Sequence, residues 1–224
     1  MLSRFEQNSN PFKDVLKMYQ PPQFQSKDRA QALQIMRAHP FASLISVDDA
    51  GLPFVTHLPL HAELQGEEDD KFVLFGHCAK PNAHWKYLQA RPQAVATFLG
   101  ANAYLSPQIY PDLARVPSWN YVAVHCTVQA TLIEEPEAKD RLLKKLIGDH
   151  EPAYKQQWID LGTEFQHKML AGIVGFELQV VDLQCKIKIN QHRPESHSAL
   201  HDMYASGNDN ERALADWMVR LGLS

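Results

Sequence analysis

The residues with the clearest chemical potential form one polar segment, Gly76-His77-Cys78-Ala79-Lys80-Pro81-Asn82-Ala83-His84-Trp85, between an expected strand and an expected helix. A helix start with free N–H groups and a nearby ammonium, here that of Lys80, attracts phosphate. Gly76 permits a close backbone approach. An ordinary strand-to-helix turn, capped by Asn82 and carrying a solvated lysine, explains the same residues, and most such turns bind nothing. The segment is a candidate phosphate site with a plain structural alternative.

Two aromatic segments marked by proline follow, Tyr104-Leu105-Ser106-Pro107-Gln108-Ile109-Tyr110 and Val116-Pro117-Ser118-Trp119-Asn120-Tyr121. Aromatic rings beside serine and asparagine can line a planar heterocycle and bind its polar edge. Loop packing, with Trp119 covering the mouth of a barrel, is an equally good interpretation of the residues alone.

Two strand-like segments carry further polar groups. In Thr56-His57-Leu58-Pro59-Leu60, a regular strand places the threonine and the histidine on opposite faces, and a hairpin strand with one polar face is the favoured interpretation. In Lys186-Ile187-Lys188-Ile189-Asn190-Gln191-His192-Arg193, alternation places both lysines on one face. They form either a patch for anions or nucleic acid, or a charged edge strand that resists aggregation.

Other site chemistries are not indicated. The chain has 11 histidines, and His57 and His61 could share a strand face, but there is no HExxH and no pair of cysteines at ligand spacing. No metal site is predicted. GxGxxG, Walker and GxSxG motifs do not occur, no catalytic residue is nominated, and no histidine stands out as a haem ligand.

The whole chain has an ordinary globular composition. Its 224 residues are 45% hydrophobic and carry a formal net charge of −4, which disfavours a strong nucleic-acid binder. The first residues lack the apolar core of a secretory signal, and no apolar run could span a bilayer. Cys78, Cys126 and Cys185 are too dispersed for a disulfide framework. We therefore expect a cytoplasmic protein with reduced thiols.

The elements that must position these residues begin after a polar, proline-marked arm over residues 1–25. Ser26 is expected to cap a helix that ends near His39, before Pro40. The expected strands are Phe41–Val47, Pro53–Leu64, Lys71–Cys78, Ala94–Leu99, Ala103–Ser106 and Tyr121–Ile133, with a hairpin turn at 48–51 and a short helix over Ala83–Ala90.

The period then changes to a helical excursion over about 136–170, whose first helix is expected to stop at Gly148. Strands Ile173–Val181 and Gln184–Asn190 are expected to pair with each other. A helix over about 209–222 opens with the capping-box spacing of Asn208 and Glu211. Its apolar stripe, Leu214, Trp217, Met218 and Leu221, packs either on a partner or on its own barrel. The pattern predicts a single domain over 1–224, a closed or nearly closed antiparallel β-barrel with peripheral helices.

Taken together and in order, these segments resemble the PaiB family. The resemblance runs from about Met18 to Arg193, and its most specific parts are the Trp119-Asn120-Tyr121 block and the segment from Gly76 to Trp85. Further matching segments are His39-Pro40-Phe41-Ala42, Ile173-Val174-Gly175-Phe176-Glu177 and the Lys186 to Arg193 segment.

The resemblance implies an FMN-binding split barrel related to the pyridoxamine-phosphate-oxidase-like flavoproteins, a homodimer with FMN at the subunit interface, and a negative transcriptional regulator. The residues then expected at the cofactor are Thr56, His57, Leu58, Pro59, His77, Lys80, Asn82, Ser106, Trp119, Lys186 and Gln191. Within this set, Lys80 and Asn82, with His77 beside them, are expected to hold the phosphate.

Three functions follow as hypotheses. The first is an FMN-binding regulator of the PaiB type, and the second is a flavin-dependent oxidoreductase acting on a small substrate. The third is a DNA-contacting repressor whose cofactor is incidental or absent, which the acidic net charge disfavours.

Overall fold

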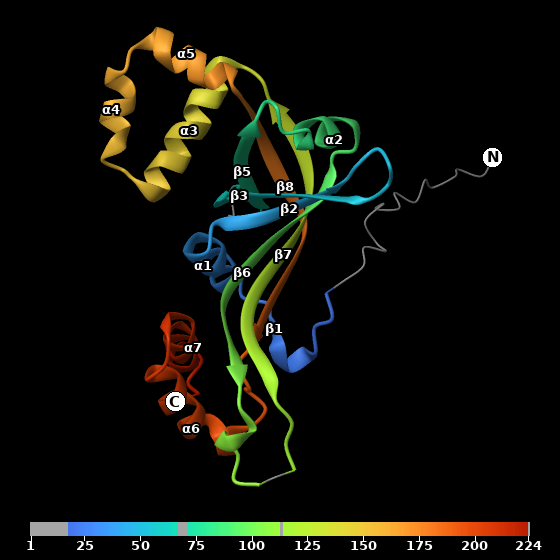
Figure 1. Cartoon of the computed structure of the whole chain (residues 1–224), viewed down its shortest axis with the longest axis vertical. Helices are drawn as coiled ribbons and strands as arrows, with labels where there is room; N and C mark the ends of the chain where they lie inside the picture. Colours follow the sequence, from blue (N-terminus) through green and yellow to red (C-terminus); the bar gives the residue numbers. More distant parts are fainter. Residues whose placement is uncertain (1–17, 67–70, 113, 224) are drawn as a thin grey trace, which may run out of the picture.

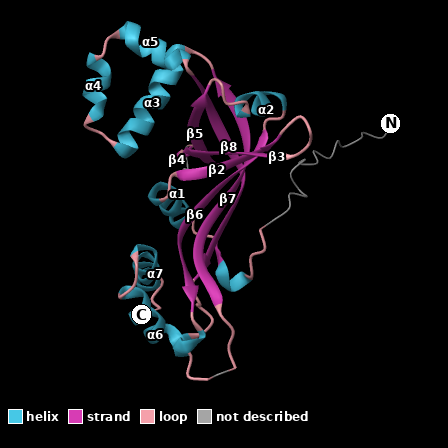
Figure 2. Ribbon diagram, in the orientation of Figure 1, coloured by secondary structure: helices cyan, strands magenta, loops and turns pink. Residues whose placement is uncertain are grey.

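The computed structural model describes residues 18–66, 71–112 and 114–223. The first 17 residues of the expected arm, and the end of the acidic loop over residues 67–70, lie outside the described residues. Figure 1 and Figure 2 show long, twisted strands with helices at the two ends and along the sides. None of the described helices is both long and apolar enough to cross a membrane.

The strands form one antiparallel sheet in the order β3-β2-β6-β7-β8-β5-β4, with β1 on the edge of β8. Their bounds are β1 Gln25–Ser26, β2 Phe41–Val47, β3 Pro53–Pro59, β4 His61–Gln65, β5 Lys71–Ala79, β6 Gln93–Leu105, β7 Ser118–Ile133 and β8 Ile173–Lys188. The predicted class, a split barrel with peripheral helices, is confirmed by this sheet and by the folds it resembles, although β3 and β4 do not pair to close the ring.

The α-helices and 3₁₀ turns (η) lie between and beyond the strands. Their bounds are η1 Pro22–Phe24, α1 Arg29–Ala38, α2 His84–Ala90, η2 Pro107–Ile109, α3 Pro136–His150, α4 Tyr154–Asp160, α5 Thr163–Ala171, η3 Pro194–Ser196, α6 His197–Ala205 and α7 Asp209–Arg220. The excursion α3–α5 stands beside the β5 end of the sheet in Figure 1. It is attached through Leu142 and Leu146, which pack on Val73 and Phe75 of β5. Whether the chain folds as a single domain stays a prediction.

Alternation along the strands divides the sheet into an inner and an outer face. Inward residues such as Leu44, Phe98, Val124 and Phe176 are fully buried in one core. The stripe of α7 packs into the same core through Leu214, Trp217 and Met218. It therefore packs on its own barrel rather than on a partner chain. Its capping box of Asn208 and Glu211 is confirmed.

Several strand boundaries differ from prediction. The expected strand Pro53–Leu64 is two strands, because β3 pairs with β2 whereas β4 pairs with β5. Between them, the N–H of Leu60 bonds the carbonyl of Pro40, and Pro59 has no N–H for a ladder. His57 and His61 therefore lie on different strands and do not share a face.

The strands expected at 94–99 and 103–106 are one strand, β6, with an irregularity between Leu99 and Asn102. The two strands expected to pair with each other at 173–190 are also one strand, β8, which pairs along β7 instead. The pairing of β8 with β7 shifts its register near Asp182, at the break that we expected between the two strands.

Two helix boundaries were wrong and one helix was missed. Asp28, not Ser26, caps α1, since its Oδ1 accepts from the N–H of Ala30 at 2.8 Å. The helix α3 continues past Gly148 to His150. The short α6, which the sequence analysis did not anticipate, follows η3 and buries Leu200 and Tyr204.

Candidate functional site

A neutral, partly buried hydrogen-bond cluster joins β3 to the turn before α2. The Asn82 side chain donates to Thr56 Oγ1 at 3.2 Å, and its Oδ1 accepts from the His84 N–H at 2.9 Å. His84 Nδ1 lies 2.8 Å from the same Thr56 Oγ1. Burial lowers the pKa of His84 to about 4, so its ring is neutral near pH 7. The structure thus brings Thr56 and Asn82 together as expected, with His84 as a third member that was not nominated.

Lys80 is exposed on the same turn and lines a neighbouring pocket of about 330 Å³ with Trp85, Glu134 and Lys139. The Trp85 indole fixes the turn by donating to the Lys80 carbonyl at 2.9 Å. The helix that follows has only seven residues and starts at His84, whose N–H Asn82 already binds. The helix dipole therefore contributes less than the sequence suggested, and the ammonium of Lys80 is the main attraction for an anion.

The two nominated histidines lie on other faces. His57 is exposed on the outer face of β3 and bonds Ser43 Oγ across the ladder at 2.9 Å. His77 shares a strand face with Phe75 on β5, and its Nδ1 is buried without a hydrogen-bond partner among the described residues. Burial lowers the pKa of His77. Leu58 fills the core and Pro59 ends β3.

Three nominated residues lie near the opposite end of the long strands. Trp119 is 49% exposed, bonds Asn102 at 3.3 Å and contacts the Tyr104 ring edge-on. Ser106 caps η2, accepting from the Gln108 N–H at 3.2 Å. Gln191 accepts from the Ile189 N–H at 2.8 Å and donates to the Ile187 carbonyl, so it shapes the bend after β8.

Lys186 lies near the Lys188 end of β8 and is buried. Its Nζ donates to the Tyr19 carbonyl at 2.7 Å and sits over the rings of Tyr19 and Tyr121. The segment ahead of α1 is therefore held against β8. Two groups of nominated residues lie far apart along β8: His77, Lys80 and Asn82 at its Gly175 end, and Ser106, Trp119, Lys186 and Gln191 at its Lys188 end. With a rise of roughly 3.3 Å per residue, the groups are on the order of 40 Å apart along the strand.

Comparison with known proteins gives the family. A family described as "Putative FMN-binding domain" matches residues 18–182. The chain belongs to this family. A Bacillus subtilis (strain 168) relative of similar length, named "Protease synthase and sporulation protein PAI 2", is 29% identical over 208 residues, covering 90% of this chain and 96% of that protein. The predicted resemblance to PaiB and the predicted cofactor, FMN, are both confirmed at the level of the family.

Solved structures with the same fold include the flavocytochrome Anf3 from Azotobacter vinelandii, with a TM-score of 0.59 at 18% identity over 74% of this chain and 69% of that one. An FAD and heme binding protein from Mycobacterium smegmatis has a TM-score of 0.52 at 16% identity over 73% of each chain. At these identities the likeness concerns the fold alone.

The turn before α2 fits the phosphate end of FMN. Lys80 supplies an ammonium and Asn82 an amide, and the pocket that Lys80 lines adds the ammonium of Lys139 and the carboxylate of Glu134. The buried Nε2 of His84, which follows the turn, has no partner among the described residues. Two ammonium groups and one carboxylate leave a net positive charge, which attracts a phosphate monoester.

Proposed function

We propose that this protein is a homodimeric FMN-binding regulator of the PaiB type, whose turn at Lys80 and Asn82 holds the flavin phosphate. The observation that carries the proposal is the exposed ammonium of Lys80 on a turn that Thr56, Asn82 and His84 fix from within. Bound FMN would supply a ring that accepts and returns electrons, and the chain's residues bind and orient it.

The dimer is supported by the separation of the nominated residues. A single flavin cannot span on the order of 40 Å, the distance along β8 between the two groups. A twofold pairing that lays the turn of one copy against the Lys188 end of the other would allow both groups to contact one ligand. The oligomer is thus a requirement of the proposed cofactor site.

The outer face of β2, β3 and β6 supports the same pairing. Phe41, Val55 and Leu99 alternate with the buried residues of their strands, and they are 70%, 46% and 63% exposed. They lie on neighbouring strands, and the paired residues Ser43 and His57, with Thr97 beside them, stand between Val55 and the other two. Exposed apolar side chains gathered on one face, with polar groups among them, are typical of a contact between protein chains.

The regulatory role is supported by the name of the Bacillus subtilis relative, which refers to protease synthesis and sporulation. Direct DNA contact gains no support from the formal net charge of −4. A flavin-dependent oxidoreductase stays an alternative prediction from the sequence.

The test is a titration of full-length protein with FMN and with riboflavin, which lacks the phosphate. We expect Lys80→Ala to weaken FMN about tenfold to a hundredfold, since charge-assisted hydrogen bonds contribute roughly 1.5–3 kcal/mol each. Riboflavin affinity should not change. Lys86→Ala, at an exposed lysine on α2 just after the turn, is the matched control. It should change the affinity for neither FMN nor riboflavin.

Lys139→Gln locates the phosphate more closely. Loss of FMN affinity in both Lys80→Ala and Lys139→Gln would place the phosphate in the pocket that these two lysines share. Loss in Lys80→Ala alone would place it on the Asn82 side. Equal losses for FMN and riboflavin in Lys80→Ala, or no loss for either, would refute the phosphate assignment.

A further inference from the structure

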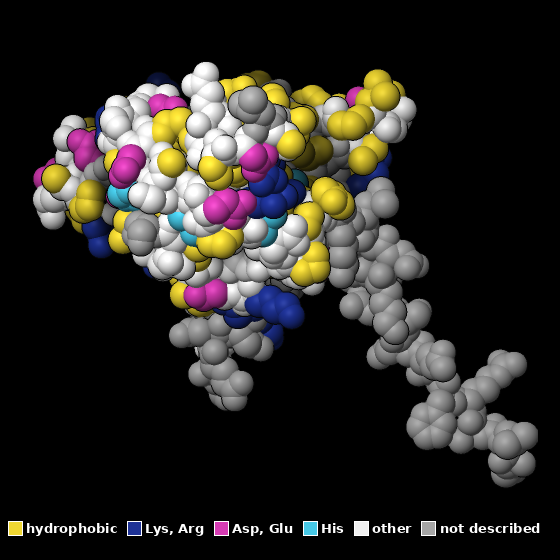
Figure 3. All heavy atoms as spheres, turned by 90° about the horizontal axis from the view of Figure 1, so that it is seen from below, with side chains coloured by type: hydrophobic (Ala, Val, Ile, Leu, Met, Phe, Trp, Pro, Cys, Tyr) yellow, Lys and Arg dark blue, Asp and Glu magenta, His cyan; other side chains and the backbone are white. Residues whose placement is uncertain are grey.

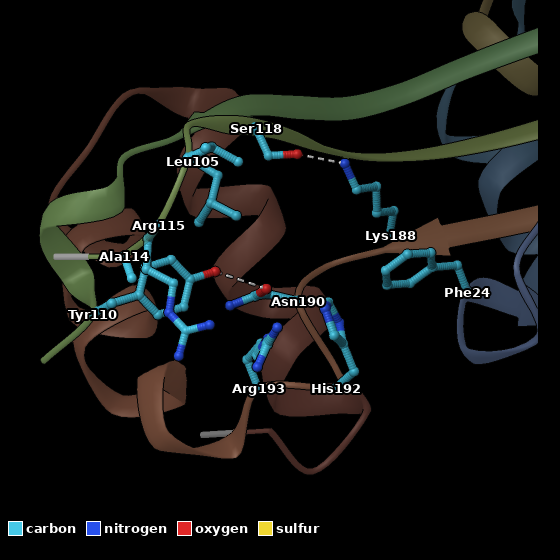
Figure 4. Close-up of a pocket in the computed structure, with 11 residues that line it drawn as sticks. Phe24, Leu105, Tyr110, Ala114, Arg115, Ser118, Lys188, Asn190, His192 and Arg193 are labelled. Atoms are coloured by element: carbon cyan, nitrogen blue, oxygen red, sulfur yellow. Dashed lines mark hydrogen bonds between the residues drawn. The ribbon is translucent and has the colours of Figure 1, made fainter. Parts of the chain in front are cut away.

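A second pocket, of about 350 Å³, lies at the far end of β8 from the Lys80 turn. Its cationic residues come from two separate segments: Arg115 from the loop after η2, and Lys188 and Arg193 from the end of β8 and the bend beyond it, where His192 also lines the pocket. Figure 4 shows the Arg115 guanidinium beside the Tyr110 ring, with Arg193 and His192 across the pocket. Seen from this end, Lys and Arg side chains gather with Asp, Glu and His side chains in the middle of the surface (Figure 3).

Cations outnumber carboxylates around this pocket. Arg115 contacts Asp112 at 2.8 Å and Glu195 at 3.6 Å, while Arg193 reaches the same Glu195 at 3.9 Å. No carboxylate is among the described residues that line the cavity itself. The two acids therefore neutralise the two guanidinium groups from outside the cavity, and the positive charge left in the lining is that of Lys188.

Lys188 adds a charge that the described residues do not neutralise. Its Nζ donates to the neutral Ser118 Oγ at 2.6 Å (Figure 4). Neither Lys188 nor the neighbouring Lys186 forms an ion pair with a carboxylate in residues 18–66, 71–112 or 114–223. Burial, followed by repulsion from Lys186, lowers the pKa of Lys188. Two lysines held close together without a counter-ion are stabilised when an anion binds between or beside them.

The walls of the pocket are held by specific contacts. Asn190 has a left-handed backbone, with φ 61°, and its buried side chain accepts from the Tyr110 hydroxyl at 3.1 Å and donates to Ser196 Oγ at 2.8 Å. Asparagine tolerates this conformation better than most residues. The Phe24 ring meets the His192 ring edge-on at 5.4 Å. These contacts hold Asn190, Tyr110 and Phe24 in the lining before any ligand arrives.

We propose that this pocket binds a small anion, namely a carboxylate or phosphate carried on a single flat ring. Guanidinium groups match both kinds of oxyanion in planar, two-point geometry, and Tyr110 and Phe24 offer surfaces for the ring. The cavity is near the small end of ligand sites, roughly 300–1,000 Å³, which favours a molecule smaller than FMN. This site goes beyond the proposed flavin site, because the Lys80 turn is at the other end of the same strand.

The probes are phenyl phosphate and benzoate, titrated separately into the full-length protein with and without saturating FMN, by calorimetry. We expect saturable binding of at least one probe, and the probe that binds tells phosphate from carboxylate. Arg193→Gln and Lys188→Gln should each weaken that binding about tenfold. Arg220→Gln, which removes an exposed arginine on α7, is the matched control and should bind as the unaltered chain does.

Three outcomes would overturn the proposal. The first is no saturable binding of either probe up to about 10 mM, a Kd weaker than any specific site of this kind. The second is an equal loss in Arg220→Gln, which would mean a general charge effect. The third is displacement of the probe by FMN together with loss of FMN affinity in Arg193→Gln, which would make the pocket part of the flavin site. Melting temperatures of the variants establish that each is folded.

Discussion

The two ends of β8 handle polar groups in opposite ways. At the Gly175 end, Thr56, Asn82 and His84 bond one another with neutral hydrogen bonds, and the ammonium of Lys80 beside them is exposed. At the Lys188 end, Lys186 and Lys188 are held by a carbonyl and a hydroxyl, and the guanidinium groups of Arg115 and Arg193 sit nearby. The difference teaches that the first network holds the turn that carries Lys80, whereas the second leaves Lys186 and Lys188 without a carboxylate partner among the described residues, for an anion to neutralise.

The largest effect we expect tests whether His84 is uncharged in the first network, the hydrogen bonds among Thr56, Asn82 and His84. Because the pKa of His84 is about 4 in the folded protein and about 6.5 in an unfolded chain, the unfolded state binds more protons between these values. His84 therefore makes its full contribution to stability above about pH 6.5, and loses up to about 3 kcal/mol of it as the pH falls through 4. Urea denaturation at pH 7.5 and 4.5 measures this loss.

His84→Phe keeps the ring volume and should flatten that pH dependence, although His77 and other buried histidines with lowered pKa values leave a smaller slope. His167→Gln, at an exposed histidine, should leave the slope unchanged. A variant His84→Phe with the full slope would show that the first network is not held neutral by His84.

The next effect tests whether the two ends meet across a dimer. Leu99→Asp places a charge on the apolar outer face and should weaken self-association about thirtyfold, or roughly 2 kcal/mol, as measured by sedimentation velocity. FMN affinity should fall with it, since the proposed site needs both copies. Val219→Asp, at a 56% exposed residue of α7 outside that face, is the control. If the monomeric variant binds FMN with unchanged affinity, the two ends of β8 do not meet across a dimer to form the cofactor site.

The smallest effect tests the uncompensated charge. Lys188→Met removes a partly buried ammonium that has no carboxylate partner in the described part of the chain, so we expect the free energy of unfolding to rise by up to about 1 kcal/mol. Lys86→Met removes an exposed lysine and should change it by less than about 0.5 kcal/mol. Urea denaturation without ligand compares them. A loss of stability in Lys188→Met would mean that the ammonium is already satisfied within the chain.

The sequence was a good guide to elements whose signals are local. The strand Phe41–Val47 has the predicted bounds, and the capping box at Asn208 opens α7. Long-range pairing was not readable from the same signals, so residues 173–190 were expected to form two paired strands, whereas β8 is one strand with a register shift near Asp182. The short α6 was missed because its few residues carry too brief a periodic pattern.

The candidate site divides in the same way. Thr56 and Asn82 were nominated and do meet, but Ser106 and Gln191 were nominated for polarity that they use in capping a 3₁₀ turn and shaping a bend. Arg115 was overlooked, because nothing near it in sequence hints that the loop carries it to Arg193. The basic residues in the segment from Lys186 to Arg193 were the sequence signal that pointed toward the second pocket.

The position of β8 in the sheet has a consequence for how the chain is made. It is the last strand to leave the ribosome, yet it lies between β7 and β5 and also receives β1. Until residue 188 has emerged, the edges of β5 and β7 have no partner, and the helices α3–α5 must be synthesised in the interval. Folding therefore waits for contacts between residues more than 160 positions apart, such as Met18 with Gln184. Such a topology folds slowly and gives chaperones a long period in which to bind the nascent barrel.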